Sequence, residues 1–391
     1  MKKNTPRKSA FCSENDISLE ELHQLCGTEA DFADFPLASS LEKNVLVYDG
    51  DELRRAVKQG QSTEFQSEMA AVFSSGPGVL VLKDAYGDTT VIDRMNIVFD
   101  HLFEEQRLFT AGSDHFSKAG ENSRIWNTFQ KSALHSPDAY IDYYKNPLIR
   151  LVAESWLGPH YQLTAQVNVV HPGGRAQICH RDYHLGFQEN DEVSRYPLHA
   201  QIMSQYLTLQ GAVAHSDMPV ESGPTLFLPY SHLYPLGYLA WRDERFRDYF
   251  ARHAVQLPLL KGDAVFFNPA LLHAAGANDT PNIHRIANLL QISSPFARAM
   301  ENVDLYQIVG HIYSTILEKV RGNALTDTEL NTLIMNSCDG YSFPSNLDTD
   351  PPRESMAPLT VEELCHNAVR EEWSDEIFKQ ALQSHFAKRQ P

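Results

Sequence analysis

The strongest constraint on the fold of this chain is a series of short apolar runs between residues 160 and 295. Clusters of Gly, Pro, Asn and Asp separate these runs, and such punctuation indicates β-strands and turns rather than helices. Many short strands in one stretch predict a closed barrel or two packed sheets. We expect strands at 162–170, around residue 180, and at 206–213, 225–229, 264–267 and 286–292.

Helical periodicity flanks this β-rich stretch on both sides. Expected helices are 50–75 (ended by the Gly- and Pro-containing segment 74–78), 88–106, 137–157, 303–321, a segment after 326 and another after 360, with one buried strand at 79–82. The expected class is α+β, in three parts: a flexible N-terminal segment (1–44), a β-rich domain with N-terminal helices (45–300), and a helical extension (301–391). The extension should pack on the domain, because about 90 residues of this composition bury too little apolar surface to fold alone.

Charge and cysteine content narrow the choice of partners. The formal net charge is −17 over 391 residues, which argues against binding to nucleic acid. The five cysteines show no CxxC spacing, so we expect reduced thiols in a cytoplasmic protein. No stretch is apolar enough to span a membrane, and the basic start is not followed by the apolar core of a secretory signal. The oligomeric state stays open.

A possible metal site begins in the expected strand around residue 180. On a strand, His180 and Asp182 would point to the same side. One imidazole and one carboxylate make up two thirds of a 2-His-1-carboxylate metal site. His273 is the best candidate for the remaining ligand, since it follows the apolar run 264–267. Rival ligands are His184 on the same strand, and His215 and His232 elsewhere.

An arginine follows the third candidate ligand at a spacing in the sequence that would allow the two residues to face each other in a hairpin. The turn-rich segment 276–282 lies between His273 and Arg285, and a hairpin centred near Asp279 would place these two residues opposite each other. A guanidinium is suited to bidentate capture of a carboxylate. His284 and Arg298 are lesser alternatives for this role. A metal triad beside a carboxylate-binding arginine suits a non-haem Fe(II) enzyme that uses a keto acid.

On these residues the sequence resembles the phytanoyl-CoA dioxygenase family of Fe(II)/2-oxoglutarate-dependent oxygenases. The resemblance covers about 160–295, through the His180-x-Asp182 motif, the run 221–232, and the Gly262-Asp263 stretch that leads to His273 and then Arg285. It implies a double-stranded β-helix, a jelly-roll, cupin-like barrel whose mouth holds the iron. The sequence departs from the family pattern in three ways: Tyr230 stands where Gly is usual, Ala275 stands where many relatives carry Ser, and the 273–285 spacing is one residue longer than the commonest.

The resemblance also implies a chemistry. His180, Asp182 and His273 would hold Fe(II), and Arg285 would bind the distal carboxylate of 2-oxoglutarate. With O2, and with ascorbate as reductant, 2-oxoglutarate would be converted to succinate and CO2. Hydroxylation of a small-molecule substrate is the default outcome, because family halogenases lack the carboxylate ligand that Asp182 provides.

Further residues are candidates for contact with the co-substrate or the substrate, although each could instead have an ordinary role in packing or at the surface. Asn168 and Gln177 are candidates for contact with 2-oxoglutarate. Candidates for substrate contact are His184, Tyr206, Arg242 and Trp126, the last in the 115–126 part of a polar stretch that predicts either a lid or a plain surface loop.

Two other classes of function stay open on the sequence alone. The chain could be a non-catalytic binding or regulatory protein that keeps the barrel, or another cupin-type metalloenzyme that does not use 2-oxoglutarate. A requirement for 2-oxoglutarate separates these cases from the oxygenase. The sequence does not specify the substrate.

Overall fold

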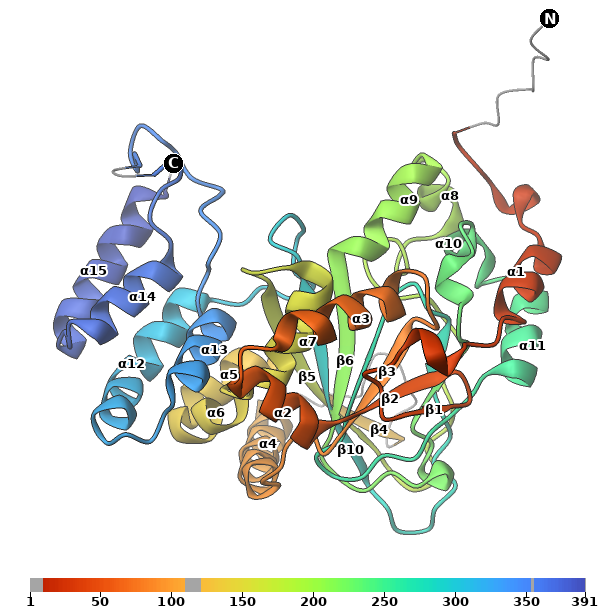
Figure 1. The fold of residues 1–391 in the computed structure, drawn as a ribbon, viewed down its shortest axis with the longest axis horizontal. Helices are drawn as coiled ribbons and strands as arrows, with labels where there is room; N and C mark the ends of the chain where they lie inside the picture. The colour runs from red at the N-terminus through yellow and green to blue at the C-terminus, as the bar shows by residue number, and fades with distance from the viewer. Residues whose placement is uncertain (1–9, 110–120, 353–354, 391) are drawn as a thin grey trace, which may run out of the picture.

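The structure is a computed structural model that describes residues 10–109, 121–352 and 355–390 (Figure 1). Its centre is an eight-stranded sheet in the order β1-β2-β3-β8-β6-β10-β5-β4, and a two-stranded sheet pairs β7 with β9. The strands are β1 Ser40–Glu42, β2 Val45–Asp49, β3 Val79–Lys83, β4 Asn122–Ile125, β5 Gln162–Val170, β6 Thr208–Ala214, β7 Thr225–Phe227, β8 Ala264–Phe267, β9 His273–Ala275 and β10 Arg285–Ser293.

The path of the chain between the two sheets defines the fold. From β5 the chain passes to a segment that bridges to β9 at His180, returns to β6, and then visits β7, β8, β9 and β10. The even-numbered strands of this part, β6, β8 and β10, lie in the large sheet, while β7 and β9 form the small one. This alternation is that of a double-stranded β-helix, or jelly roll, so the expected fold class is confirmed.

The two faces of the large sheet bury different partners, because side chains alternate along a strand. On the outer face, Leu163, Ala165 and Leu290 belong to the main core with the neighbouring helices. On the inner face, Val81 and Phe267 belong to a separate core that includes Phe227 of the small sheet. The inner face is the one that can carry a site.

Six of the helices that come before β5 cover the outer face. They are α2 Gly50–Lys58, α3 Ser62–Ser74, α4 Thr90–Phe109, α5 Thr128–His135, α6 Pro137–Tyr144 and α7 Pro147–Leu157. The prolines that open α6 and α7 stand where a helix has no use for a backbone N–H. Short helices near the small sheet are α8 Asn190–Val193, α9 Leu198–Ser204, α10 Gly237–Ala240 and α11 Glu244–His253.

The C-terminal part is helical and lies beyond α5 and α6 (Figure 1). Its helices are α12 Leu305–Arg321, α13 Asp327–Ser337, α14 Val361–Arg370 and α15 Asp375–Lys388. Thr326 and Thr360 each form a capping box at the start of a helix. Ile312 and Ile334 are fully buried in the same core as the outer face of the sheet, so this part shares the apolar core of the barrel.

The N-terminal part differs from the expected flexible segment. Residues 10–44 include α1 Leu19–Cys26 and the edge strand β1. Leu22 is fully buried, and the backbone N–H of Ser18 donates to the hydroxyl of Tyr234 at 2.7 Å. The Ser18–Glu21 capping pattern predicts the short helix α1, but the mostly polar sequence of this helix does not indicate its packing. In the described residues, the helices include none with the length and apolar character needed to cross a bilayer.

Candidate metal centre

The segment that carries the first two candidate ligands is an extended loop, so the strand expected there is wrong. His180 makes a single two-way backbone bridge with His273, with N···O distances of 3.0 and 3.1 Å. Directly after Asp182, Tyr183 and His184 adopt left-handed backbone conformations with φ of 64° and 47°. These two residues turn the chain away before a ladder can extend.

The side chains nevertheless meet as expected. The ligand atoms of His180, Asp182 and His273 all lie within 4.8 Å of one another. Nε2 of His180 is 3.5 Å from Oδ1 of Asp182, and Nε2 of His273 is 3.5 Å from Oδ2. Two imidazole nitrogens therefore face one carboxylate across a gap that a metal ion could bridge.

The hydrogen bonds of the two imidazoles set which nitrogen faces that gap. Nδ1 of His180 lies 2.8 Å from the carbonyl oxygen of Ile178, and Nδ1 of His273 lies 2.8 Å from that of Leu271. A carbonyl oxygen only accepts, so each Nδ1 is the donor. In the neutral imidazole, Nε2 then keeps its lone pair, and this tautomer is the form that binds a metal.

Asp182 is held by a residue that the sequence analysis missed. Nε2 of Gln210, on β6, donates to Oδ2 of Asp182 at 2.6 Å. Burial alone would raise the pKa of Asp182, but His180, His273 and this hydrogen bond hold it well below its ordinary value. Burial lowers the pKa of His180 despite the nearby carboxylate. The group thus combines an ionised carboxylate with a neutral imidazole at His180.

Arg285 lies on the inner face at the start of β10. Its side chain is buried, and its Nη1 donates to the carbonyl oxygens of Ser222 and Gly276 at 3.3 and 3.5 Å. Burial lowers its pKa to about 10. No acidic side chain within the described ranges forms an ion pair with it. A buried cation without a counter-ion is costly, so this position is suited to an anionic ligand.

The hairpin register expected for Arg285 is wrong. β9 pairs with β7, whereas β10 pairs with β5 and β6, so Arg285 lies opposite Val170 rather than His273. The intervening segment crosses from the small sheet to the large one. Asn278 fixes this crossing, because its side-chain amide donates to the carbonyl oxygens of Val170 and Ile283. The symmetric hairpin assumed from the sequence ignores such a change of sheet.

Small and apolar side chains separate Arg285 from the triad. Residues paired across strands share a face. Gln210, which binds Asp182, lies opposite Gln291 of β10. Between that row and Arg285, the inner face carries Ala212, Ala214, Ala287 and Leu289. On β6 and β10 the inner face therefore carries small or apolar side chains between the triad and the guanidinium, with Gln166 and Asn168 of β5 beside them; we call this stretch of the inner face the slot.

Of the residues expected near 2-oxoglutarate, one borders this slot and one does not reach into it. Asn168 of β5 lies opposite Ala287 on the inner face, and its Oδ1 is buried without a hydrogen-bond partner in the described parts of the chain. Oε1 of Gln177 instead accepts from the backbone N–H of Ala275 at 3.2 Å. Gln177 thus supports the end of β9.

Two of the expected substrate contacts lie near the triad. His184 packs against the ring of Tyr183, and its Nε2 is buried without a partner among the residues described. Trp126 lies under the guanidinium of Arg124, whose positive charge contributes to the lowered pKa of His180. The first half of the loop expected between 115 and 126 (115–120) lies outside the described residues, and the second half includes the strand β4.

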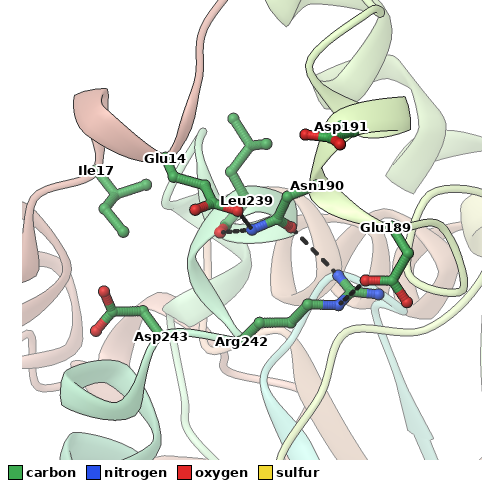
Figure 2. A pocket seen from close by; sticks show the side chains of 8 residues that line it. All are labelled: Glu14, Ile17, Glu189, Asn190, Asp191, Leu239, Arg242 and Asp243. Atoms are coloured by element: carbon green, nitrogen blue, oxygen red, sulfur yellow. Dashed lines mark hydrogen bonds and ion pairs between the residues drawn. The ribbon is translucent and has the colours of Figure 1, made fainter.

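The other two expected contacts lie farther out. Tyr206 is 45% exposed and stacks on Trp156, which packs with the core of the outer face. Arg242 lies 4.0 Å over the ring of Trp241 and lines a pocket of about 450 Å³ beside Glu189 and Asn190 (Figure 2). No triad residue lines that pocket.

Trp241 and Gln210 are the neighbours of the triad that sequence reasoning missed. The ring of Trp241 lies 6.5 Å from that of His180, so Trp241 rather than Arg242 borders the metal group. Gln210 carried a usable signal, because a polar residue in the middle of an apolar strand needs a buried partner. Trp241 carried none.

The rival ligands have other partners or positions. His215 lies between Tyr143 and Asn96, at 2.7 Å from each. His284, an alternative to Arg285 rather than a rival ligand, forms a contact of 2.9 Å with His171. His232 is buried beside Gly78 and away from the triad. Among the described residues, the triad is the one group of three or more His, Cys, Asp or Glu side chains that could hold a metal ion.

The fold and this group of side chains define a double-stranded β-helix protein with a 2-His-1-carboxylate arrangement. Comparison with known families makes the assignment specific. The profile of the family described as phytanoyl-CoA dioxygenase (PhyH) matches residues 57–287. The chain belongs to this family. No curated protein sequence matches it.

Several solved structures are similar in part. One is the α-ketoglutarate-dependent epimerase SnoN from nogalamycin biosynthesis (20% identity, 59% of this chain and 84% of that chain, TM-score 0.41). A second is EctD from S. alaskensis, solved with 2-oxoglutarate and 5-hydroxyectoine (19% identity, 60% and 77%, TM-score 0.44). A third is HygX from Streptomyces hygroscopicus, solved with nickel and 2-oxoglutarate (14% identity, 61% and 90%, TM-score 0.42).

Proposed function

We propose that this protein is an Fe(II)/2-oxoglutarate-dependent dioxygenase that hydroxylates a small-molecule substrate. One observation supports the proposal: the triad lies toward one end of the slot, and the buried cation of Arg285, which forms no ion pair within the described ranges, lies at the other. A keto acid with a second, distal carboxylate matches both ends. A barrel that only binds an apolar or cationic ligand would gain nothing from a buried guanidinium.

The residues present fit an iron ion. Two imidazoles with exposed Nε2 lone pairs and one ionised carboxylate are the donor set of non-haem Fe(II) oxygenases. When bound, the iron would activate O2 and couple its reduction to the conversion of 2-oxoglutarate to succinate and CO2. The protein's own contribution is placement of the reactants and exclusion of water.

The residues around the slot have separate tasks. Arg285 binds the distal carboxylate, and the alanines between Arg285 and the triad leave room for the methylene groups of the co-substrate. Gln210 orients Asp182, and Asn168 offers a buried acceptor beside the slot. Ala275 cannot donate the hydrogen bond that a serine at this position would give, which weakens co-substrate binding by about 1.5–3 kcal/mol without removing it.

The test is uncoupled turnover by the purified protein. With Fe(II), ascorbate and 2-oxoglutarate under air, we expect slow formation of succinate that is lost in His180→Ala and Arg285→Ala. Arg55→Ala is the matched control, since the side chain of Arg55 is 68% exposed on α2, and it should retain turnover.

A second measurement separates the alternatives. Under anaerobic conditions, the Fe(II)/2-oxoglutarate complex has a metal-to-ligand absorption band. If the band appears but no succinate forms, turnover requires the substrate that is to be hydroxylated in addition to 2-oxoglutarate. Absence of the band would refute the proposal and leave either a non-catalytic barrel or a metalloenzyme that does not use 2-oxoglutarate. The five cysteines are free, in keeping with the cytoplasmic location that we propose.

A further inference from the structure

A cluster of buried polar atoms without partners adjoins the triad on the side away from Arg285. Its members are Oε1 of Gln210, Oε1 of Gln291 and Oγ1 of Thr208, none of which has a hydrogen-bond partner in the described parts of the chain. The three residues are only 3%, 8% and 1% exposed. Native proteins leave few such atoms unpaired, and each costs about 1–3 kcal/mol.

Strand register brings these atoms together at the triad. Gln291 of β10 lies directly opposite Gln210 of β6, and Thr208 lies in the next row, opposite Ser293. All four side chains point to the inner face, and Gln210 itself binds Asp182. Because Arg285 starts β10 and Ser293 ends it, the cluster lies beyond the slot assigned to 2-oxoglutarate. These buried acceptors therefore lie on the side of the triad that the proposed co-substrate does not occupy.

The orientation of one amide in the cluster is fixed. The ionised carboxylate of Asp182 can only accept, so the atom of Gln210 that donates to it is the amide nitrogen. The atom left unpaired is therefore an acceptor oxygen. Nε2 of His184, two residues after Asp182 in the chain, is also buried without a partner among the described residues. The buried atoms of this region thus lack hydrogen-bond partners, and most of them need a donor.

The charge around the cluster limits which donors fit. Its own atoms are neutral amide and hydroxyl groups, and in the row next to Gln291 the Nη1 of Arg124 donates to Oε1 of Gln166 at 3.2 Å. A cationic amine would meet this guanidinium and a bound metal ion. An apolar acyl chain would leave every acceptor unpaired. A neutral hydroxyl group satisfies them, because it both donates and accepts.

We propose that the substrate is a neutral, hydroxyl-bearing small molecule, such as a polyol or sugar-like compound, whose hydroxyl groups bond to Gln210, Gln291 and Thr208. This inference rests on the proposed function and names the substrate class of the same site. It assigns Thr208 and Gln291 as residues that select the substrate. The family name, in contrast, points to an acyl thioester.

The test is direct binding to the anaerobic Fe(II)/2-oxoglutarate complex, followed by ligand-observed NMR. The probes are three matched sets: cyclitols and monosaccharides, the corresponding amino sugars, and medium-chain acyl-CoA thioesters. We expect the neutral hydroxylated set to bind. Thr208→Val should weaken that binding about two- to tenfold, as expected for one lost hydrogen bond, and Thr208→Ser should restore it. Gln291→Leu should act like Thr208→Val, whereas Gln380→Leu, exposed on α15, should change nothing.

Three results would overturn the inference: no binding by any hydroxylated probe, tighter binding by amino sugars or acyl thioesters, or hydroxylated-probe binding that Thr208→Val leaves unchanged. The absorption band of the same samples reports 2-oxoglutarate binding independently. If the protein shows the band but prefers acyl thioesters, the proposed function stands and this inference is refuted. If the protein shows no band, the proposed function itself is refuted.

Discussion

Replacing Arg285 with methionine should separate ligand binding from folding. The pKa of Arg285 falls from an ordinary 12.5 to about 10 because the group is buried. The unfolded chain therefore holds this proton more tightly than the folded one, and the charge destabilises the folded protein at pH 7. The depression corresponds to about 3 kcal/mol. Arg285→Met removes that cost, so the free energy of unfolding without 2-oxoglutarate should stay constant or rise.

The same substitution should abolish most of the stabilisation by 2-oxoglutarate. Two charge-assisted hydrogen bonds to a carboxylate contribute about 3 kcal/mol together, so the dissociation constant should rise about a hundredfold. At a concentration 100 times the dissociation constant of the native protein, 2-oxoglutarate should stabilise that protein by about 2.7 kcal/mol. It should stabilise Arg285→Met by about 0.4 kcal/mol.

The assay is urea denaturation of the anaerobic Fe(II) protein, with and without 2-oxoglutarate, with Arg55→Met as the control. A loss of more than about 2 kcal/mol without 2-oxoglutarate would mean that the guanidinium mainly supports the loops of Ser222 and Gly276. Full stabilisation of the variant by 2-oxoglutarate would refute the anchoring role.

Three further predictions concern the surroundings of the site. Gln210→Leu should weaken Fe(II) binding about 10- to 100-fold, since Asp182 loses the bond that orients it; an unchanged affinity in an anaerobic metal titration would contradict this role. Removing the metal with a chelator should lower the Tm of the native protein but leave that of His273→Ala unchanged, because the variant lacks a ligand; an equal drop in both would place the metal elsewhere. Burial raises the pKa of Glu301 from 4.5 to about 7, so the stability that goes with its protonated form is present below pH 4.5 and is lost as the pH rises through 7. Glu301→Gln should therefore raise the Tm at pH 8 and hardly change it at pH 4.5; equal shifts at the two values would show that the ionised carboxylate carries no cost.

The sequence predicted the β-rich core because local patterns encode it. Alternating and apolar runs mark β5, β6, β8 and β10 well. The types of ligand residue and their order along the chain identified His180, Asp182 and His273 as one candidate group. These features depend on residues near one another in the chain or on a motif of fixed spacing. The outer helices also followed from their periodicity.

What failed depends on contacts between distant segments. The strand expected at His180 is a single bridge, because Tyr183 and His184 take left-handed conformations that no periodicity encodes. The hairpin from His273 to Arg285 assumed one sheet where there are two. The bond from Gln210 to Asp182 joins two segments whose proximity only the barrel creates.

The division of the site between two sheets has a mechanical consequence. His180 and His273 are joined to each other by backbone hydrogen bonds on the small-sheet side, whereas Arg285 belongs to the large sheet. In the proposed complex, a co-substrate held by the metal group at one end and by Arg285 at the other would link the two sheets and resist their separation. Loss of CO2 would leave succinate, which is one carbon shorter and lacks the keto group, so this link across the barrel would be weaker after turnover than before it.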